Sequence, residues 1–435
     1  MNKYITLLLC YFLLIGLQAQ DNLYFDLQQC IEYAEKNNLT LQSAAMDIST
    51  SEIQLRQAKM QMTPSVSATI GQNFAYSHGN NSGASLSGNY GVNAGLTLFN
   101  GLTIRNSIKQ SKLQLTQAEL ILEQSKNQVR INLIRSYLSI LMNQEMLTYQ
   151  QTVLKSSRSQ LQQGEQQYKV GQILESDYLL LQSQYYADSV NIENTRIAID
   201  NDYVTLRNIL ALSPDQSLTI VTPDSVRLAQ AMALPDFEEV IKKTMDYLPE
   251  LKIKNNNLEI ADYDIKIARG EYYPSLSLST GIGTGYNAFY GQQQKGISNN
   301  LLDNLNENLG LNLSIPIYKQ GTVRNNVNIK KLQYDQAKLA LEQMEKDVRQ
   351  EVEIHYLDVK KAYNDYYLTE MQKNAYYANY LAYNQKFQYG TITAVDLLQQ
   401  QTNYLHILNT YMQNKYNFLL QKKVLDVYTG EKIEL

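Results

Sequence analysis

Two stretches of the chain, residues 103–163 and 322–388, contain neither proline nor glycine. These two residue types disfavour a helix interior most strongly, so each stretch predicts one uninterrupted α-helix. At a rise of 1.5 Å per residue, such helices are about 90–100 Å long. A compact globular core cannot cover a helix of that length. The two stretches therefore predict long helices that lateral neighbours stabilise along their whole length.

Side chains of similar size recur every seven residues along both predicted helices, as in a coiled coil. In the first stretch one row is apolar and a second row is mostly small: Ile108, Leu115, Leu122 and Val129, and Ile104, Ser111, Ala118 and Ser125. The matching rows of the second stretch are Val327, Tyr334, Leu341 and Val348, and Val323, Lys330, Ala337 and Met344. The small row predicts close approach of a neighbouring helix on that side.

The sequence also repeats itself. Pro64-Ser65-Val66-Ser67 recurs as Pro274-Ser275-Leu276-Ser277, an offset of 274 − 64 = 210 residues. Further along the offset becomes 219, as in Leu122-Glu123-Gln124 and Leu341-Glu342-Gln343. Matches that keep a constant offset over roughly a hundred residues are improbable by chance and predict a duplicated structural unit.

We expect the following organisation from this repeat. The first copy covers residues 21–211, and residues 212–236, with three of the seven prolines, form an irregular connector. The second copy covers residues 237–430, and residues 431–435 form a short tail. After each long helix the chain is expected to reverse at a glycine, Gly171 or Gly390, and to return as a helix over 172–211 or 391–428.

Each copy also predicts a β-hairpin, over residues 64–99 and 274–318, because the hydrophobic period there switches to two. Val66, Ala68 and Ile70, for example, alternate with small polar residues. The polar face is almost wholly Ser, Thr, Asn and Gly, which suits the lining of a lumen better than an open surface. Apolar runs of roughly 10–13 residues also suit tilted strands that cross an outer membrane.

Three boundaries follow from the same patterns. Residues 27–61 predict one helix, which Pro64 ends. In the second copy a loop is expected at about residues 287–308, and the last strand is expected to alternate from Leu309 to Ile317.

Charge and composition exclude several function classes. The 38 Lys and Arg against 42 Asp and Glu give a net charge of −4, so the chain has no basic excess for binding nucleic acid. With 3 His and 2 Cys, and without a nucleophile motif, metal, haem, iron–sulfur and thiol chemistry have little support. We therefore expect no enzyme activity, no cofactor and no metal site.

Residues 1–20 are expected to be a secretory signal peptide, with Lys3 before an apolar run; a retained N-terminal anchor is the alternative. Its removal leaves Cys30 as the single cysteine, expected to be a small core residue. No later segment offers 18 consecutive apolar residues, so entry into a membrane would use β-strands.

Four predicted strands cannot close a membrane barrel, since the smallest single-chain barrels have eight. An open strand edge in lipid leaves unpaired backbone groups, so copies of the chain must share one sheet. Two copies give 4 × 2 = 8 strands and three give 4 × 3 = 12. The Gly- and Ser-rich inner face favours three copies, because side chains fill the lumen of an eight-stranded barrel.

The chain resembles the TolC-like outer membrane efflux proteins over about residues 23–430. The resemblance rests on the duplicated helix, hairpin, long helix and return helix. It also rests on two signatures, Tyr168-Lys169-Val170-Gly171 with Asp177 and Phe387-Gln388-Tyr389-Gly390-Thr391 with Asp396.

The resemblance implies a mainly α fold with membrane β: a homotrimer whose 12-stranded transmembrane β-barrel continues into a long α-helical barrel. It also implies a cell outer membrane location that extends into the periplasm. The function would be that of a passive exit duct in a tripartite efflux pump or type I secretion system. The implied partners are outer membrane lipid, a periplasmic membrane-fusion adaptor and an inner-membrane pump of RND or ABC type. A soluble periplasmic coiled-coil scaffold or adaptor is the alternative function.

The same resemblance places Asp177 and Asp396 at the periplasmic entrance of a pore, where rings of carboxylates favour cations. Helix capping is the competing interpretation, because Thr393 and Asp396 have the spacing of a capping box. The four turn residues Tyr168, Gly171, Gly390 and Thr391 resemble the grooves where adaptor hairpins insert.

This sequence departs from the family's gate pattern at three positions. Phe387 stands at the family's Tyr position, Ile392 at its Arg position and Gln399 at its second Asp position. The hydroxyl and the positive charge of a salt-bridge latch are therefore missing. We expect closure of the entrance to depend on packing of Phe387 and Tyr389 instead.

Overall fold

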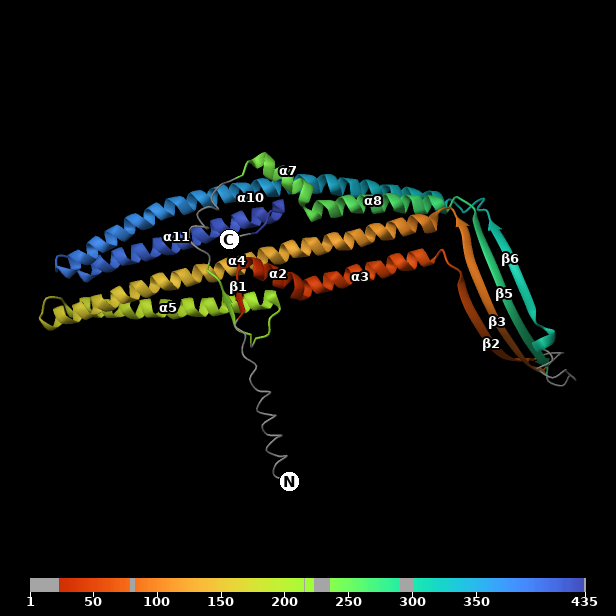
Figure 1. Ribbon diagram of the computed structural model, residues 1–435, viewed down its shortest axis with the longest axis horizontal. Helices are drawn as coiled ribbons and strands as arrows, with labels where there is room; N and C mark the ends of the chain where they lie inside the picture. Colours follow the sequence, from red (N-terminus) through yellow and green to blue (C-terminus); the bar gives the residue numbers. More distant parts are fainter. Residues whose placement is uncertain (1–22, 79–82, 215, 223–234, 290–300, 434–435) are drawn as a thin grey trace, which may run out of the picture. The chain divides into compact units, whose positions relative to one another are not determined.

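The computed structural model describes residues 23–78, 83–214, 216–222, 235–289 and 301–433 (Figure 1). The expected signal peptide, much of the connector and part of the loop at 287–308 lie outside these residues. Within the described ranges, no helix combines the length and the apolar character that crossing a membrane requires.

The same order of elements occurs twice along the chain (Figure 1). The first set consists of β1 (Leu23–Phe25), α2 (Leu27–Asn37), α3 (Leu39–Met60), β2 (Ser65–Ser77), β3 (Gly83–Asn100), α4 (Thr103–Lys169) and α5 (Glu175–Leu210). The second consists of β4 (Leu218–Ile220), α7 (Phe237–Tyr247), α8 (Pro249–Gly270), β5 (Ser275–Phe289), β6 (Asn306–Ser314), α10 (Thr322–Gln388) and α11 (Ala394–Thr429).

The two long helices form as the sequence predicts. α10 has the predicted bounds, and α4 continues beyond residue 163 to Lys169. α4 runs through Gly164, where a Cβ atom would collide with the Leu181 side chain of α5. Glycine at this point lets the two helices approach closely, so here it marks a packing contact and not a helix end.

The prediction of one helix over residues 27–61 is wrong, because the chain breaks at Asn38. Its backbone is extended (φ −62°, ψ 127°), and its side-chain oxygen accepts a hydrogen bond from the Thr40 N–H at 2.9 Å. Its amide nitrogen donates to the Ile209 carbonyl at 2.7 Å. Asn38 therefore caps α3. The second copy breaks at the equivalent place, where Pro249 begins α8.

The two hairpins form one four-stranded antiparallel sheet in the order β2-β3-β5-β6. The bounds predicted for the last strand, 309–317, are wrong: β6 begins at Asn306, opposite Gly283, and ends at Ser314, opposite Ser275. Pro316 lacks the N–H that a longer ladder would need. The loop predicted at about residues 287–308 is shorter in the structure, since β5 continues to Phe289 and β6 begins at Asn306.

The chain divides into two compact units. One contains residues 44–60 of α3, residues 250–270 of α8, the four-stranded sheet, and residues 103–121 and 322–344 of the long helices. The other contains the remainder of the long helices with α2, α5, α7, α11 and the parallel pair β1–β4.

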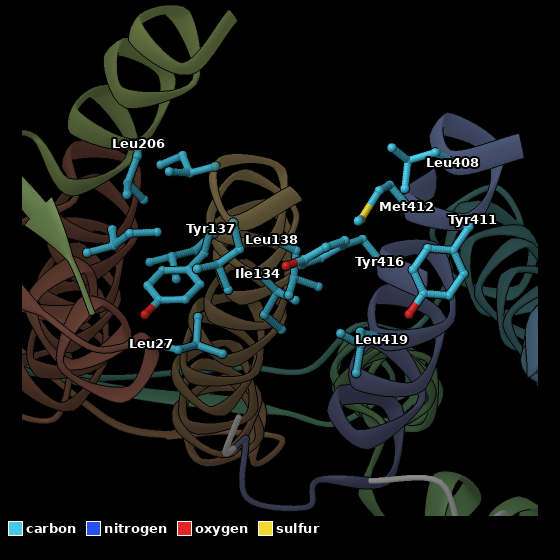
Figure 2. Close-up of a cluster of buried hydrophobic side chains, with 14 of the residues drawn as sticks. Leu27, Ile134, Tyr137, Leu138, Leu206, Leu408, Tyr411, Met412, Tyr416 and Leu419 are labelled. Carbon is cyan, nitrogen blue, oxygen red and sulfur yellow. The ribbon is translucent and has the colours of Figure 1, made fainter. Parts of the chain in front are cut away.

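The second unit holds the main hydrophobic core, which draws on α2, α4, α5 and α11 (Figure 2). Leu27, Tyr137, Leu206 and Leu408 are among its buried side chains. Cys30 is completely buried in the same core, as predicted. Burial raises the pKa of its thiol to about 12 and keeps the thiol in its unreactive form.

Candidate functional site

The chain reverses direction at Gly171 and Gly390, both of which have left-handed backbone angles (φ 73° and 68°). After α4, the Gln172 N–H donates to the Gln167 carbonyl at 2.8 Å. After α10, the Thr391 N–H donates to the Lys386 carbonyl at 3.0 Å. This is the Schellman ending of a helix, and glycine adopts it without the Cβ strain of other residues. The predicted chain reversals at Gly171 and Gly390 are therefore confirmed.

The predicted adaptor-docking residues Tyr168, Gly171, Gly390 and Thr391 are all exposed at these two reversals. Tyr168 stacks on Tyr178 of α5, with ring centroids 5.5 Å apart and planes within 6°. The residues at these positions of the second copy, Phe387 and Leu397, are both buried. The two reversals thus present different surfaces, one with a stacked aromatic pair and one without it.

Asp396 lies in the first turn of α11 and belongs to a capping box with Thr393, as the sequence suggested. The Asp396 N–H donates to Thr393 Oγ1 at 3.2 Å, and the Thr393 N–H donates to Asp396 Oδ2 at 3.2 Å. The Thr393 hydroxyl also donates to Oδ2 at 2.7 Å. Hydrogen bonds from the Thr393 side chain and backbone lower the pKa of Asp396, so its exposed carboxylate stays charged.

Asp177 holds the equivalent position in the first turn of α5, but the residue at its N-cap is Leu174, which makes no side-chain cap. The Asp177 carboxylate is therefore not part of a capping box. Both carboxylates lie close after a helix reversal, where the positive end of a helix dipole favours negative charge.

Phe387 and Tyr389, the two residues expected to close the entrance by packing, lie in different surroundings within the single chain. Phe387 is 1% exposed and packs in the hydrophobic core, whereas Tyr389 is 83% exposed. Side chains two residues apart on a helical turn do not face each other, which explains the separation. Of the two rings, only that of Tyr389 projects from the reversal. Ile392 packs against the core, and the Gln399 amide donates to Asn403 Oδ1 at 3.2 Å.

A buried polar cluster, which the sequence did not reveal, joins three helices some way from the reversals. We define it as Ser157 of α4, Asp188 of α5 and Gln401 of α11. The Ser157 hydroxyl donates to Asp188 Oδ2, and Gln401 Nε2 donates to the same oxygen at 3.1 Å and to Ser157 Oγ at 3.0 Å. Gln184 Nε2 donates to Asp188 Oδ1 at 2.8 Å.

Asp188 is only 4% exposed, and no ion pair to it occurs in the described ranges. Burial raises the pKa of its carboxyl, while hydrogen bonds from Ser157, Gln184 and Gln401 act against that rise. One sequence signal could have pointed to it. At the offset of 219 residues, the second copy has Ile407, an apolar core residue, where the first has Asp188.

Further amide and hydroxyl contacts connect α4 to α10 beside this cluster. Gln160 Nε2 donates to Tyr380 Oη at 3.2 Å and to Asn384 Oδ1 at 3.0 Å. Closer to the reversal, Gln163 Nε2 donates to the Gln388 carbonyl at 3.3 Å. No group of three or more His, Cys, Asp or Glu side chains suited to a metal occurs in the part of the chain that the structure describes.

Residues 30–212 and 241–431 match the sequence profile of the family described as outer membrane efflux protein. The chain belongs to the outer membrane efflux protein family.

Outer membrane protein TolC of Escherichia coli (strain K12) is 22% identical over 410 residues, covering 91% of this chain and 80% of TolC. TolC of Vibrio cholerae is 22% identical over 428 residues and 94% of each chain. Among solved structures, the Campylobacter jejuni CmeC outer membrane channel has the same fold: TM-score 0.76, 17% identity, covering 93% of this chain and 85% of CmeC.

Membership makes the chain an outer membrane efflux channel protein, located in the outer membrane and extending into the periplasm. The two matched regions each contain most of one set of helices and strands, so both halves of the chain share the family's fold. The family is one of channel proteins and not of enzymes.

Proposed function

We propose that three copies of this chain form a passive exit duct, in which their strands make one 12-stranded barrel and their helices make a tube below it. The edge strands of the four-stranded sheet carry this proposal. Among the described residues, β2 and β6 each pair with one neighbouring strand, which leaves one side of each without a backbone partner there. In lipid such edges are expensive, and pairing β2 of one copy with β6 of the next satisfies them.

Side chains on the edge strands support the membrane location. Ile70 on β2 and Leu309 on β6 are 77% and 76% exposed in the single chain, and both belong to the apolar rows of their strands. Exposed apolar rows that alternate with Ser, Thr, Asn and Gly suit lipid on one face and water on the other. Three copies give 3 × 4 = 12 strands, wide enough to keep the polar lumen open.

Exposed apolar stripes on two helices supply the lateral contacts between copies below the barrel. On α5 the stripe consists of Leu179, Tyr186, Val190, Ile197 and Val204. On α10 it consists of Ile354, Leu357, Leu368 and Met371. Spacings of 7 and 4 residues, or of 3 and 11, return to one face of a helix. We place the α5 stripe of one copy against the α10 stripe of the next.

The two helix reversals form the periplasmic entrance in this assembly. Asp177 and Asp396 from three copies contribute 3 × 2 = 6 carboxylates, which favour cations. Tyr389 projects at the same end, and the exposed reversals at Tyr168, Gly171, Gly390 and Thr391 receive the hairpins of a membrane-fusion adaptor. An inner-membrane pump of RND or ABC type supplies the energy, and the duct itself remains passive.

The oligomeric state of the purified protein tests this function. We expect a detergent-solubilised trimer by light scattering, and stable ohmic channels when it is added to a planar bilayer. Cell fractionation separates the alternative, because a soluble periplasmic scaffold would wash off the membranes. A monomer that stays in solution in plain buffer without detergent would overturn the proposal.

A further inference from the structure

A cavity of about 500 Å³ lies between α4, α5 and α11, within the compact unit that holds the main core. Small-molecule sites in proteins have volumes of about 300–1,000 Å³, so the cavity can hold a compact organic ligand. On α5 its wall consists of Gln184, Asp188, Asn191 and Thr195, whose spacing of 4, 3 and 4 residues follows one helix face. The cavity therefore has a defined wall on each helix.

Apolar side chains form one part of the lining. Met142, Met146 and Val153 of α4 contribute to it, together with Leu405 of α11. Met142 and Met146 are four residues apart and lie next to each other on the same face of α4. Methionine side chains are flexible and polarizable, and they adapt to flat or irregular apolar groups. This part of the cavity suits the hydrocarbon or aromatic body of a ligand.

The polar part of the lining has buried acceptors that a ligand could satisfy. Asp188 is only 4% exposed, and its Oδ1 accepts from Gln184 Nε2 at 2.8 Å, which leaves a lone pair of that oxygen for a further donor. Gln150 Oε1 is buried and has no hydrogen-bond partner among the described residues. The described lining contains no Lys or Arg. A positively charged group that donates hydrogen bonds complements this arrangement.

The proposed contact between copies leaves this cavity free. Val190 and Ile197 belong to the exposed stripe of α5 and come 2 and 9 residues after Asp188. At about 100° per residue, both side chains lie about 160–180° around the helix from Asp188. A neighbouring copy that packs on the stripe therefore contacts the opposite side of α5 and does not fill the cavity.

We propose that the cavity is a binding site for an organic monocation, a protonated amine attached to an apolar body. The ammonium group pairs with the Asp188 carboxylate and donates to Gln150 Oε1. Met142, Met146 and Leu405 contact the apolar body. The inference goes beyond the duct function and does not depend on it, because the site belongs to the helices of a single chain.

Three probes that share one apolar body test the proposal: 4-phenylbutylamine, 4-phenylbutanol and 4-phenylbutanoate. They are titrated by calorimetry at pH 7.5 into the detergent-solubilised full-length protein, with detergent alone as the blank. We expect the amine to bind once per chain, at least tenfold more tightly than the neutral alcohol, and the anion not to bind. An amine that does not saturate, or that binds no better than the alcohol, would overturn the proposal whether or not the protein forms channels.

Asp188→Asn removes the negative charge with little change of shape. We expect the affinity for the amine to fall by tenfold or more, to the level of the alcohol, while the affinity for the alcohol stays the same. Asp200→Asn is the matched control, since Asp200 is exposed on the same helix and lies outside the cavity. An Asp188→Asn protein that binds the amine like the wild type, or an equal loss in the control, would show that Asp188 is not the counter-charge.

Gln150→Leu provides a second variant that leaves the polar cluster untouched, in case Asp188→Asn does not fold. Loss of one acceptor should weaken amine binding by about threefold to tenfold, whereas Gln151→Leu, at the exposed neighbouring position, should have no effect. Leu405→Trp adds volume to the lining and should abolish binding of both the amine and the alcohol. If Leu405→Trp keeps its helix content by circular dichroism and still binds the amine, the ligand lies elsewhere and the assignment of this cavity is wrong.

Discussion

α5 and α11 are equivalent return helices of the two copies, yet their surfaces differ. Leu179 and Ile197 of α5 are 50% and 58% exposed, whereas their counterparts on α11, Leu398 and Tyr416, are each 7% exposed. The helix of the second copy is covered by its own chain, and that of the first is not. A single chain therefore buries the apolar face of α11 but leaves the similar face of α5 exposed. We expect a neighbouring chain to pack on this face of α5.

The largest effect is expected from charging the α5 stripe. Val190→Glu combined with Ile197→Glu places two carboxylates on the face that we assign to the neighbouring copy. Burial of unpaired charges is strongly unfavourable, so the trimer should be lost completely while the single chain keeps its helix content. Light scattering and circular dichroism of the detergent-solubilised protein measure the two properties.

The control for this variant is Arg196→Glu, which adds a carboxylate at an exposed position beside the stripe. It should leave the trimer intact. If the double variant also remains a trimer, the α5 stripe is not the interface, and the difference between α5 and α11 needs another explanation.

A substitution in the core face of α11 should lower the stability of the single chain and not the contact between chains. Leu408 is completely buried, so Leu408→Ala leaves a cavity and should destabilise the fold by about 2–5 kcal/mol. Val190→Ala on the exposed stripe should cost the single chain far less, about 0.5 kcal/mol or below. Denaturant unfolding followed by circular dichroism compares the two, and equal losses would show that α5 is buried within the chain after all.

Two substitutions at the starts of α11 and α5, the return helices of the two repeats, should change stability by a smaller amount and in opposite directions. Thr393 caps α11, and Leu174 stands at the equivalent position of α5 without capping it. Thr393→Ala should destabilise the start of α11 by about 1 kcal/mol, and Leu174→Thr should stabilise the start of α5 by a similar amount through a new capping box with Asp177. Hydrogen exchange of the first-turn amides measures both. Opposite signs are expected, and like signs would contradict the capping difference.

Asp177 and Asp396, which we propose to lie at the entrance, should produce the smallest effect. Asp396→Asn removes charge from an exposed site that salt screens, so we expect cation selectivity to fall by no more than about twofold, with little change in conductance. Reversal potentials in a salt gradient measure this, with Asp177→Asn for comparison. A several-fold jump in conductance at unchanged selectivity would assign Asp396 to closing the entrance instead.

The pH dependence of the Asp396 cap follows from the direction of its pKa. Hydrogen bonds from Thr393 lower the folded-state pKa below the ordinary value of 3.8. A lowered carboxyl pKa stabilises the fold above the unfolded value, and the contribution is lost as pH falls through the folded value. The cap and the cation preference should therefore persist at pH 5 and weaken only below pH 3.8.

The long helices and hairpins could be predicted because they depend on local pattern. The stretch without proline and glycine predicted the bounds of α10. The alternation of apolar and polar residues predicted β2 and β3. The break at Asn38 was missed because it depends on a single side chain that bonds Ile209, 171 residues away. β6 was shifted because its apolar alternation continues to Ile317, while pairing with β5 ends at Ser314.

The candidate site was predictable only in part. Gly171, Gly390 and the capping box of Asp396 are local features, and sequence spacing locates them. Burial of Phe387 depends on which side of α10 meets the core, and the family's alignment position does not reveal that. The polar cluster joins residues 157, 188 and 401, which lie too far apart along the chain for a sequence motif to connect them.

Pairing of β3 with β5 within one chain has a consequence for the kinetics of assembly. If single hairpins had to build a ring of twelve strands, six molecules would have to meet. Here one polypeptide carries two hairpins already joined, so only three encounters between β2 and β6 remain to be made. Ring closure by three bodies depends on a much lower power of concentration than closure by six, and a scarce protein can therefore still complete its ring.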